Sequence, residues 1–142
     1  METLQAMAKL ARAGASSAEI AGLAQWCSRV VSPGACLDSW VREHFRYRDE
    51  NEEVIRTPQR MMHDLTTAGY IEGDCDDVST LYASAFKAMG IPVRFVAIRY
   101  DNSADFKHVF VEALENLIWQ RFDATVPQGT VHVEVERMVV YV

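Results

Sequence analysis

The strongest constraint on the fold is a change in the spacing of apolar residues near residue 90. Before this point, apolar residues recur every three or four positions, as on one face of a helix. After it, they alternate with polar residues or run together in short β-branched and aromatic segments, as in strands. Gly90 and Pro92 mark the boundary, because glycine commonly ends a helix and proline cannot continue one. Helices followed by consecutive strands predict an α+β fold with an antiparallel sheet.

Local signals set the expected boundaries of the helices. Ser16 and Glu19 fit a capping box, and Thr57 followed by Pro58 fits a second helix start. The expected helices cover about residues 2–12, 17–30, 37–45, 58–69 and 75–89, with 46–53 as a loop, and the expected strands cover about 93–100, 107–114, 117–123 and 131–141.

The helix expected at residues 75–89 has the clearest apolar stripe, formed by Val78, Leu81, Tyr82, Ala85, Phe86 and Met89. We therefore expect it to be central and to pack on the sheet. A chain of 142 residues suits one domain. We expect that single domain to span residues 1–142, with a helical N-terminal extension at 1–35 and a core at 36–142.

Charge and hydropathy exclude two classes of partner. Lys and Arg number 14 against 20 Asp and Glu, giving a net charge of −6, so we expect no nucleic-acid binding. No apolar run approaches the roughly 20 residues that span a bilayer, so we expect no membrane insertion. Residues 1–17 lack the uninterrupted apolar core of a secretory signal, and the expected location is cytoplasmic.

The three cysteines have different surroundings in the sequence. An odd number cannot pair fully within one chain, and Cys27 and Cys36 fit free thiols packed as small apolar groups. Cys75 instead stands at the start of the most apolar helix. Unpaired amides and the positive end of the helix dipole stabilise a thiolate there, although the neighbouring acidic residues oppose it.

Two further residues complete a candidate catalytic set with Cys75. His108 opens one expected strand and Asp123 ends the next. A hairpin turning near residues 115–117 places the two opposite each other, where a carboxylate can orient an imidazole. A nucleophile, a base and an orienting acid are the groups that nucleophilic catalysis requires.

Several motifs resemble the transglutaminase-like superfamily. Residues 73–77 read GDCDD and residues 90–94 read GIPVR, similar to the nucleophile motif of that family. Residues 106–112 (FKHVFVE) resemble its His motif, and 119–125 (WQRFDAT) resemble its Asp motif, in which Asp-x-Thr is common. Residues 45–47 and 57–58 also resemble the approach to the nucleophile, and the similarity covers about residues 40–127.

The resemblance implies a papain-like core, with a central helix packed on an antiparallel sheet. It implies that Cys75 is the nucleophile, His108 the general base and acid, and Asp123 the residue that orients the imidazole. The expected enzyme attacks a peptide or protein amide, forms a thioester and passes the acyl group to water or an amine, most often water. No cofactor is implied. The alternative is a binding or structural protein that keeps the fold, a class that includes proteins carried by phages and prophages.

The second oxyanion donor and the acidic cluster leave alternatives open. Trp40, Tyr47 and Gln59 each carry a donor upstream of the nucleophile. The acidic cluster, formed by Asp74, Asp76 and Asp77, fits a metal site or simply a helix start, which favours acidic residues. Because no second cysteine stands at zinc-like spacing, we expect no metal.

The remaining polar residues are expected to be structural or exposed. They are His44, His63 and His132, with Asp101 and Asp105 in a turn. The C-terminal strand carries Val131, Val133, Val135, Val139 and Val140, and it is expected to form a sheet edge through which copies or partners associate.

Overall fold

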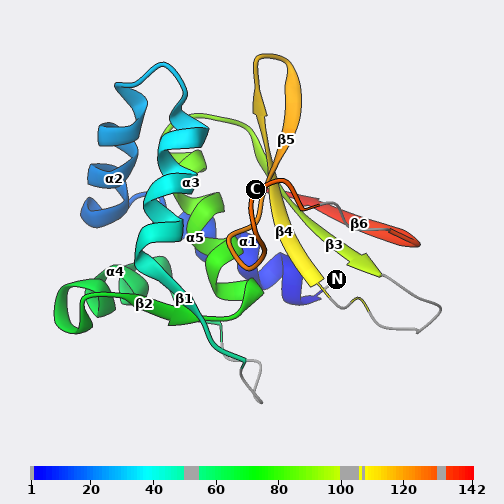
Figure 1. Ribbon diagram of the computed structural model, residues 1–142, viewed down its shortest axis with the longest axis horizontal. Coiled ribbons are helices and arrows are strands. Elements are labelled where there is room, and N and C mark those ends of the chain that lie inside the picture. The colour runs from blue at the N-terminus through cyan, green and yellow to red at the C-terminus, as the bar shows by residue number, and fades with distance from the viewer. Residues whose placement is uncertain (1, 50–54, 100–105, 107, 131–133) are drawn as a thin grey trace.

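The computed structural model describes residues 2–49, 55–99, 106, 108–130 and 134–142 (Figure 1). Its helices are α1 (Glu2–Gly14), α2 (Ala18–Ser28), α3 (Pro33–His44), α4 (Pro58–Ala68) and α5 (Cys75–Ala88). Its strands are β1 (Phe45–Tyr47), β2 (Ile71–Gly73), β3 (Val93–Arg99), β4 (His108–Glu115), β5 (Ile118–Phe122) and β6 (Glu136–Tyr141). The predicted α+β class is confirmed.

The main sheet is antiparallel throughout and has the order β5-β4-β3-β6. Figure 1 shows the helices gathered on one side of it. Strands β4 and β5 form the predicted hairpin, and its two turn residues, Asn116 and Leu117, both have positive φ angles of 53° and 65°. A turn of this kind matches the right-handed twist of the paired strands.

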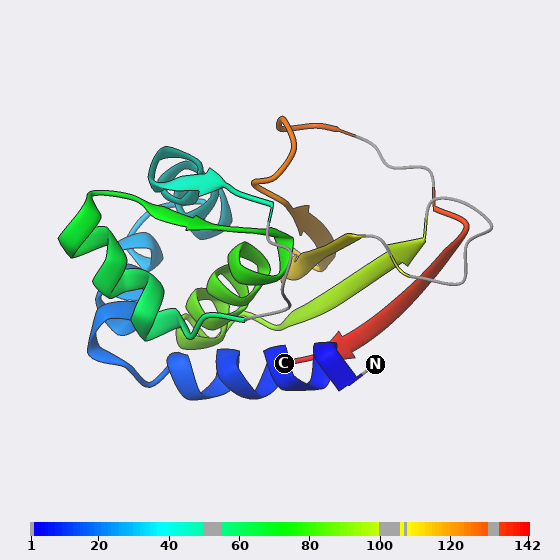
Figure 2. The ribbon, with the colours of Figure 1, turned by 90° about the horizontal axis from the view of Figure 1, so that it is seen from below.

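Helix α5 is the centre of the molecule, as predicted, and it contacts β3 and β4. Its stripe is buried from Val78 to Phe86, while Met89 is only partly buried. The polar side of the helix is buried as well, including Ser79 and Thr80, because α1, α2, α3 and α4 also contact α5. Figure 2 shows α1 along one edge of the molecule, and the apolar residues of α1 and α2 belong to the same core as α5.

A small parallel sheet of β1 and β2 was not predicted from the sequence. Residues 45–47 pair with 71–73, and the amide of Arg48 donates to the carbonyl of Gly73 (2.8 Å). Arg48 also forms an ion pair with Glu72 (2.8 Å). Three-residue strands are too short to show an alternating pattern. This sheet holds the segment before α5 against the end of α3.

The predicted cap of the second helix is wrong by one residue. Ser17, not Ser16, is the N-cap of α2, and its hydroxyl accepts a hydrogen bond from the amide of Ile20. The Thr57 cap and Pro58 start of α4 are confirmed. None of the described helices is long and apolar enough to cross a membrane. Five residues discussed above lie outside the described residues: Asp101, Asp105, Val131, His132 and Val133.

Candidate active site

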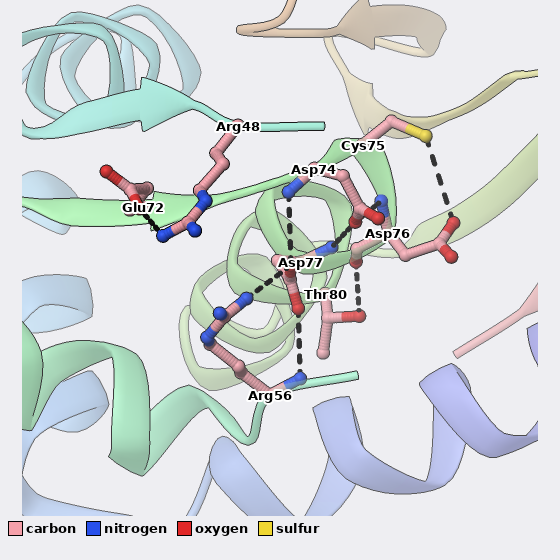
Figure 3. A network of polar contacts seen from close by, with 8 residues as sticks. All are labelled: Arg48, Arg56, Glu72, Asp74, Cys75, Asp76, Asp77 and Thr80. Atoms are coloured by element: carbon pink, nitrogen blue, oxygen red, sulfur yellow. Dashed lines mark hydrogen bonds and ion pairs between the residues drawn. The ribbon is translucent and has the colours of Figure 1, made fainter. Parts of the chain in front are cut away.

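Cys75 is the first residue of α5, directly after the helix cap (Figure 3). The Asp74 side chain accepts hydrogen bonds from the amides of Asp76 (3.0 Å) and Asp77 (3.3 Å). In return, the Asp77 carboxylate accepts one from the amide of Asp74 (3.1 Å). This reciprocal capping box fixes where the helix begins. The prediction that Cys75 stands next to the N-cap is confirmed.

Asp77 anchors this helix start to the segment before α4. Its carboxylate is fully buried, forms an ion pair with the guanidinium of Arg56 (3.0 Å) and accepts from the amide of the same residue (2.9 Å). The chain passes so close that a Cβ at Gly73 would lie 2.5 Å from the Asp77 carboxylate. The glycine of the GDCDD motif is therefore required by a close approach.

The acidic cluster divides into three separate roles. Asp74 caps the helix and Asp77 is the buried anchor, while the Oδ1 atom of Asp76 lies 3.9 Å from the sulfur of Cys75. Figure 3 shows Asp77 and the Cys75 sulfur pointing away from each other. Among the described residues, no three His, Cys, Asp or Glu side chains are grouped so that they could hold a metal ion.

The surroundings of the thiol favour its neutral form. Burial is the largest effect, and with the charges of Asp76 and Asp74 it raises the pKa of Cys75 to about 12. The backbone of Val109 acts in the other direction and lowers the pKa of the thiol. Burial and the charges of Asp77 and Asp76 likewise raise the pKa of Asp74 to about 6. The sequence predicts a lowered thiol pKa, and this structure gives the opposite direction.

His108 and Asp123 form a direct, buried contact. The Nε2 atom of His108 lies 2.5 Å from Oδ2 of Asp123, and their side chains are 10% and 2% exposed. The other carboxylate oxygen of Asp123 accepts from the amide (3.1 Å) and the hydroxyl (2.7 Å) of Thr125. Burial alone would raise the pKa of Asp123, but the contacts with His108 and Thr125 outweigh it and lower that pKa.

The three candidate residues lie on or beside elements that pack together: α5 contacts β4, and Phe122 at the end of β5 packs against Tyr82 and Phe86 of α5. The pKa of the Cys75 thiol responds to the backbone of Val109, the residue that follows His108, and to the charge of Asp123. The strand register differs slightly from the prediction. Phe122 pairs with Val111, so Asp123 lies one residue beyond β5 and reaches His108 diagonally, not from a directly opposite position.

The candidates for the second oxyanion donor differ in position. Gln59 is exposed on α4, and Trp40 packs on the core, with its ring 4.6 Å from that of His44. Tyr47 ends β1, and its hydroxyl donates to Asp49 (3.1 Å). Burial, Asp49 and the charge of Cys75 raise the pKa of that hydroxyl. The charge of Cys75 thus contributes to the raised pKa of Tyr47.

The other described histidines and cysteines are exposed or contact their neighbours in the fold. The Nδ1 atom of His44 lies 2.7 Å from the carbonyl oxygen of Trp40, and His63 is exposed on α4. Cys27 is buried and its sulfur lies 2.7 Å from that of Cys36. Burial and the nearby Cys36 raise the pKa of Cys27 to about 12.

Comparison with known proteins identifies the family. The fold is similar to the crystal structure of a candidate cysteine protease from Cytophaga hutchinsonii, with a TM-score of 0.51 and 23% identity over 78% of this chain and 40% of that one. The chain thus spans less than half of that protein. No curated protein matches the chain. The family model of the transglutaminase-like superfamily matches residues 21–124, which include most of α2 and the residues Cys75, His108 and Asp123. The chain belongs to the transglutaminase-like superfamily.

Proposed function

We propose that this protein is a thiol-dependent acyl-transfer enzyme that hydrolyses peptide or protein amides. Cys75 is the nucleophile, His108 is the general base and acid, and Asp123 orients the imidazole. The observation that carries this proposal is the 2.5 Å contact between His108 and Asp123, beside the helix start that bears Cys75. The family and the resemblance to a candidate cysteine protease support the same reaction type.

The chemistry begins as the imidazole of His108 takes the proton of the thiol while the sulfur attacks. The sulfur attacks the amide carbonyl, a C–S bond forms, and the C=O electron pair moves to oxygen. The C=O bond then re-forms as the C–N bond breaks, and the imidazolium of His108 gives its proton to the leaving amine. Water, deprotonated by the same imidazole, attacks the thioester. The products are a carboxylic acid and the thiol, which regains its proton.

The helix cap limits which amides can stabilise the oxyanion. Asp74 already accepts from the amides of Asp76 and Asp77, whereas the amide of Cys75 is not among those that it caps. We therefore assign the first oxyanion contact to the backbone amide of Cys75. Tyr47 is the side chain that we propose as the second donor, because the charge of Cys75 affects the pKa of its hydroxyl, which would turn from Asp49 to the oxyanion.

The raised pKa of the thiol determines how the nucleophile is activated. A thiol with a pKa of about 12 is almost entirely protonated at neutral pH. A stable thiolate–imidazolium pair is thus not the resting state that we propose. Instead, His108 removes the proton as the sulfur attacks, in the manner of a serine–histidine pair. Asp123 matters because it stabilises the positive charge that then forms on the imidazole.

A second candidate function is binding without catalysis. Two observations favour it: the thiol is difficult to ionise, and β6 forms an edge of the main sheet. An edge strand can pair with a strand of another molecule. In that case the protein would associate through β6, with a second copy or with a protein partner. Size-exclusion chromatography with light scattering tests this association, and a sharp monomer peak counts against it for copies of the chain.

The deciding experiment combines a peptide-amide library with trapping of the thioester. Wild type should release amines and, with hydroxylamine present, give hydroxamates. Cys75→Ala should do neither, and His108→Ala should be severely impaired. Asp123→Asn should lose up to about 10⁴-fold, as when the acid of a serine triad becomes an amide. Cys36→Ser is the matched thiol control and should retain activity. Absence of acylation with every probe would favour the binding protein.

A further inference from the structure

The side chain of Arg42, on α3, joins three acceptors that come from different parts of the chain. Its Nε donates to the carboxylate of Asp38 on the same helix (3.0 Å). Its Nη1 donates to the carbonyl of Val126 (2.7 Å), and its Nη2 donates to the carbonyl of Asp123 (2.8 Å). One planar guanidinium thus holds two backbone carbonyls of the segment that follows β5.

The network continues from Asp38 into the helix that carries Cys75. The other carboxylate oxygen of Asp38 accepts a hydrogen bond from the hydroxyl of Tyr82 (2.5 Å). Tyr82 is fully buried on α5, two helical turns after Cys75. Burial and the charge of Asp38 raise the pKa of Tyr82 well above its usual range, so its hydroxyl stays protonated and donates. Tyr82, Asp38 and Arg42 therefore connect the nucleophile helix to the Asp123 segment.

This connection matters because, among the described residues, the ladder between β4 and β5 ends at Phe122, one residue before Asp123. Beyond that point, Thr125 and His108 bind the carboxylate of Asp123, whereas Arg42 binds its backbone carbonyl. The guanidinium thus sets the place from which the carboxylate reaches the imidazole.

We propose that Arg42 is a positioning residue, which holds the backbone of Asp123 at the distance from α5 that the His108 contact requires. This proposal rests on the function proposed above, because it assigns Asp123 the role of orienting the imidazole. Asp38 orients the guanidinium, and Tyr82 ties Asp38 to α5. Lysine cannot replace Arg42, since an ammonium lacks the planar fork that reaches several acceptors at once.

The surroundings of Arg42 allow a chemical-rescue test. Its side chain is 27% exposed, so truncation does not empty a core position. A cavity of about 260 Å³ adjoins it, and Asp38, Asp123 and Val126 also line that cavity. Free guanidinium could enter the space that Arg42→Ala leaves and bind the same acceptors.

The test measures amide hydrolysis together with a signal that does not depend on activity. In Arg42→Ala and Arg42→Lys, kcat should fall by about 10- to 100-fold with little change in KM, the size of loss expected from a small misplacement of a catalytic group. The low-field proton resonance of the His108–Asp123 hydrogen bond should weaken or disappear. Millimolar guanidinium chloride should restore both in Arg42→Ala. Tyr82→Phe, which keeps the buried ring, should show a smaller loss.

The matched control is Arg60→Ala, which removes another Arg–Asp pair at i,i+4 spacing, with Asp64 on α4. It should change neither kcat nor the resonance. An unchanged kcat and resonance in Arg42→Ala would overturn the proposal. A loss of kcat that guanidinium does not restore, together with a lower melting temperature, would also overturn it. If wild type hydrolyses nothing, the proposed function fails, while the resonance still decides whether Arg42 positions Asp123.

Discussion

Replacing Asp76 by asparagine should make the thiol of Cys75 easier to ionise. The two side chains lie 3.9 Å apart, and the charge of Asp76 follows burial as a cause of the raised thiol pKa. Two unit charges about 4 Å apart repel by about 1 kcal/mol in water and about 4 kcal/mol at an effective dielectric constant near 20. Because 1.36 kcal/mol corresponds to one pKa unit, the pKa should fall by about one to three pH units.

Asparagine suits this test because it changes little besides the charge. Its side-chain carbonyl can still accept a hydrogen bond from the thiol, so the contact itself is retained. A small loss of stability, about 0.3–1 kcal/mol, is expected because an acidic residue in the first turn of a helix stabilises it. Asp64→Asn, on α4, is the matched control and should leave the Cys75 thiol as it is in wild type.

The assay is the rate of iodoacetamide modification of Cys75 against pH, followed by peptide mass spectrometry so that Cys27 and Cys36 do not contribute. At pH 8, Asp76→Asn should react faster by about 3- to 40-fold, because the gain in thiolate is partly offset by the lower nucleophilicity of a less basic sulfur. An unchanged pH profile would refute the electrostatic reasoning. A wild-type profile with an apparent pKa below about 8 would refute the raised pKa itself.

Three further predictions concern the fold, acid stability and the other thiols. Phe86→Ala should cost about 3–5 kcal/mol by urea denaturation, since Phe86 is fully buried against Phe122; a cost under about 1 kcal/mol would contradict its central place. The pKa of Asp123 is lowered on folding, so its contribution to stability is complete above its unfolded value of 3.8 and is lost as pH falls through the folded value. Between pH 5 and 2, the free energy of unfolding should therefore fall less steeply with decreasing pH in Asp123→Asn than in wild type. Mild peroxide treatment should link Cys27 to Cys36, seen as the loss of two hydrogen atoms in the peptide that joins them; retention of both thiols would show that they do not meet.

The parts of the site that could be predicted depend on signals within a few neighbouring residues. Thr57 and Pro58 mark a helix start, and Gly90 and Pro92 mark the end of another, because each acts through its own backbone. The position of Cys75 at a helix start is likewise indicated by its neighbours in the sequence. Its place follows from the polar residues before the apolar stripe of α5.

The hairpin shows how a local signal can give the right element with a shifted register. The expected turn near residues 115–117 is present, but its centre lies between Asn116 and Leu117. Asparagine readily adopts a positive φ, whereas leucine rarely does. The residue type at position 117 therefore does not indicate a turn. Asp123 consequently lies past the end of β5, where Arg42 supports it by binding its backbone carbonyl.

That support could not be predicted, because its partners are far apart in the sequence. Arg42 reaches carbonyls 81 and 84 residues away, and Arg56 pairs with Asp77 across 21 residues. A charged residue on a predicted helix or loop is usually solvent-exposed, and nothing in the spacing distinguishes these arginines from the others. Asp38 is similar, since its burial depends on Tyr82 of another helix.

The thiol pKa reveals why the helix-dipole argument predicted the wrong direction. The helix dipole acts through unpaired amides at the helix start, but Asp74 has already capped two of them, and the charge of Asp74 raises the thiol pKa. The dipole contributes about 0.3–1 kcal/mol, whereas a carboxylate at the distance of Asp76 contributes about 1–4 kcal/mol with the opposite sign. Burial adds to the second effect. In the proposed mechanism, a nucleophile in these surroundings depends on a base that accepts its proton during attack, so the proposed activity requires that Asp123 place His108 and that Arg42 place Asp123.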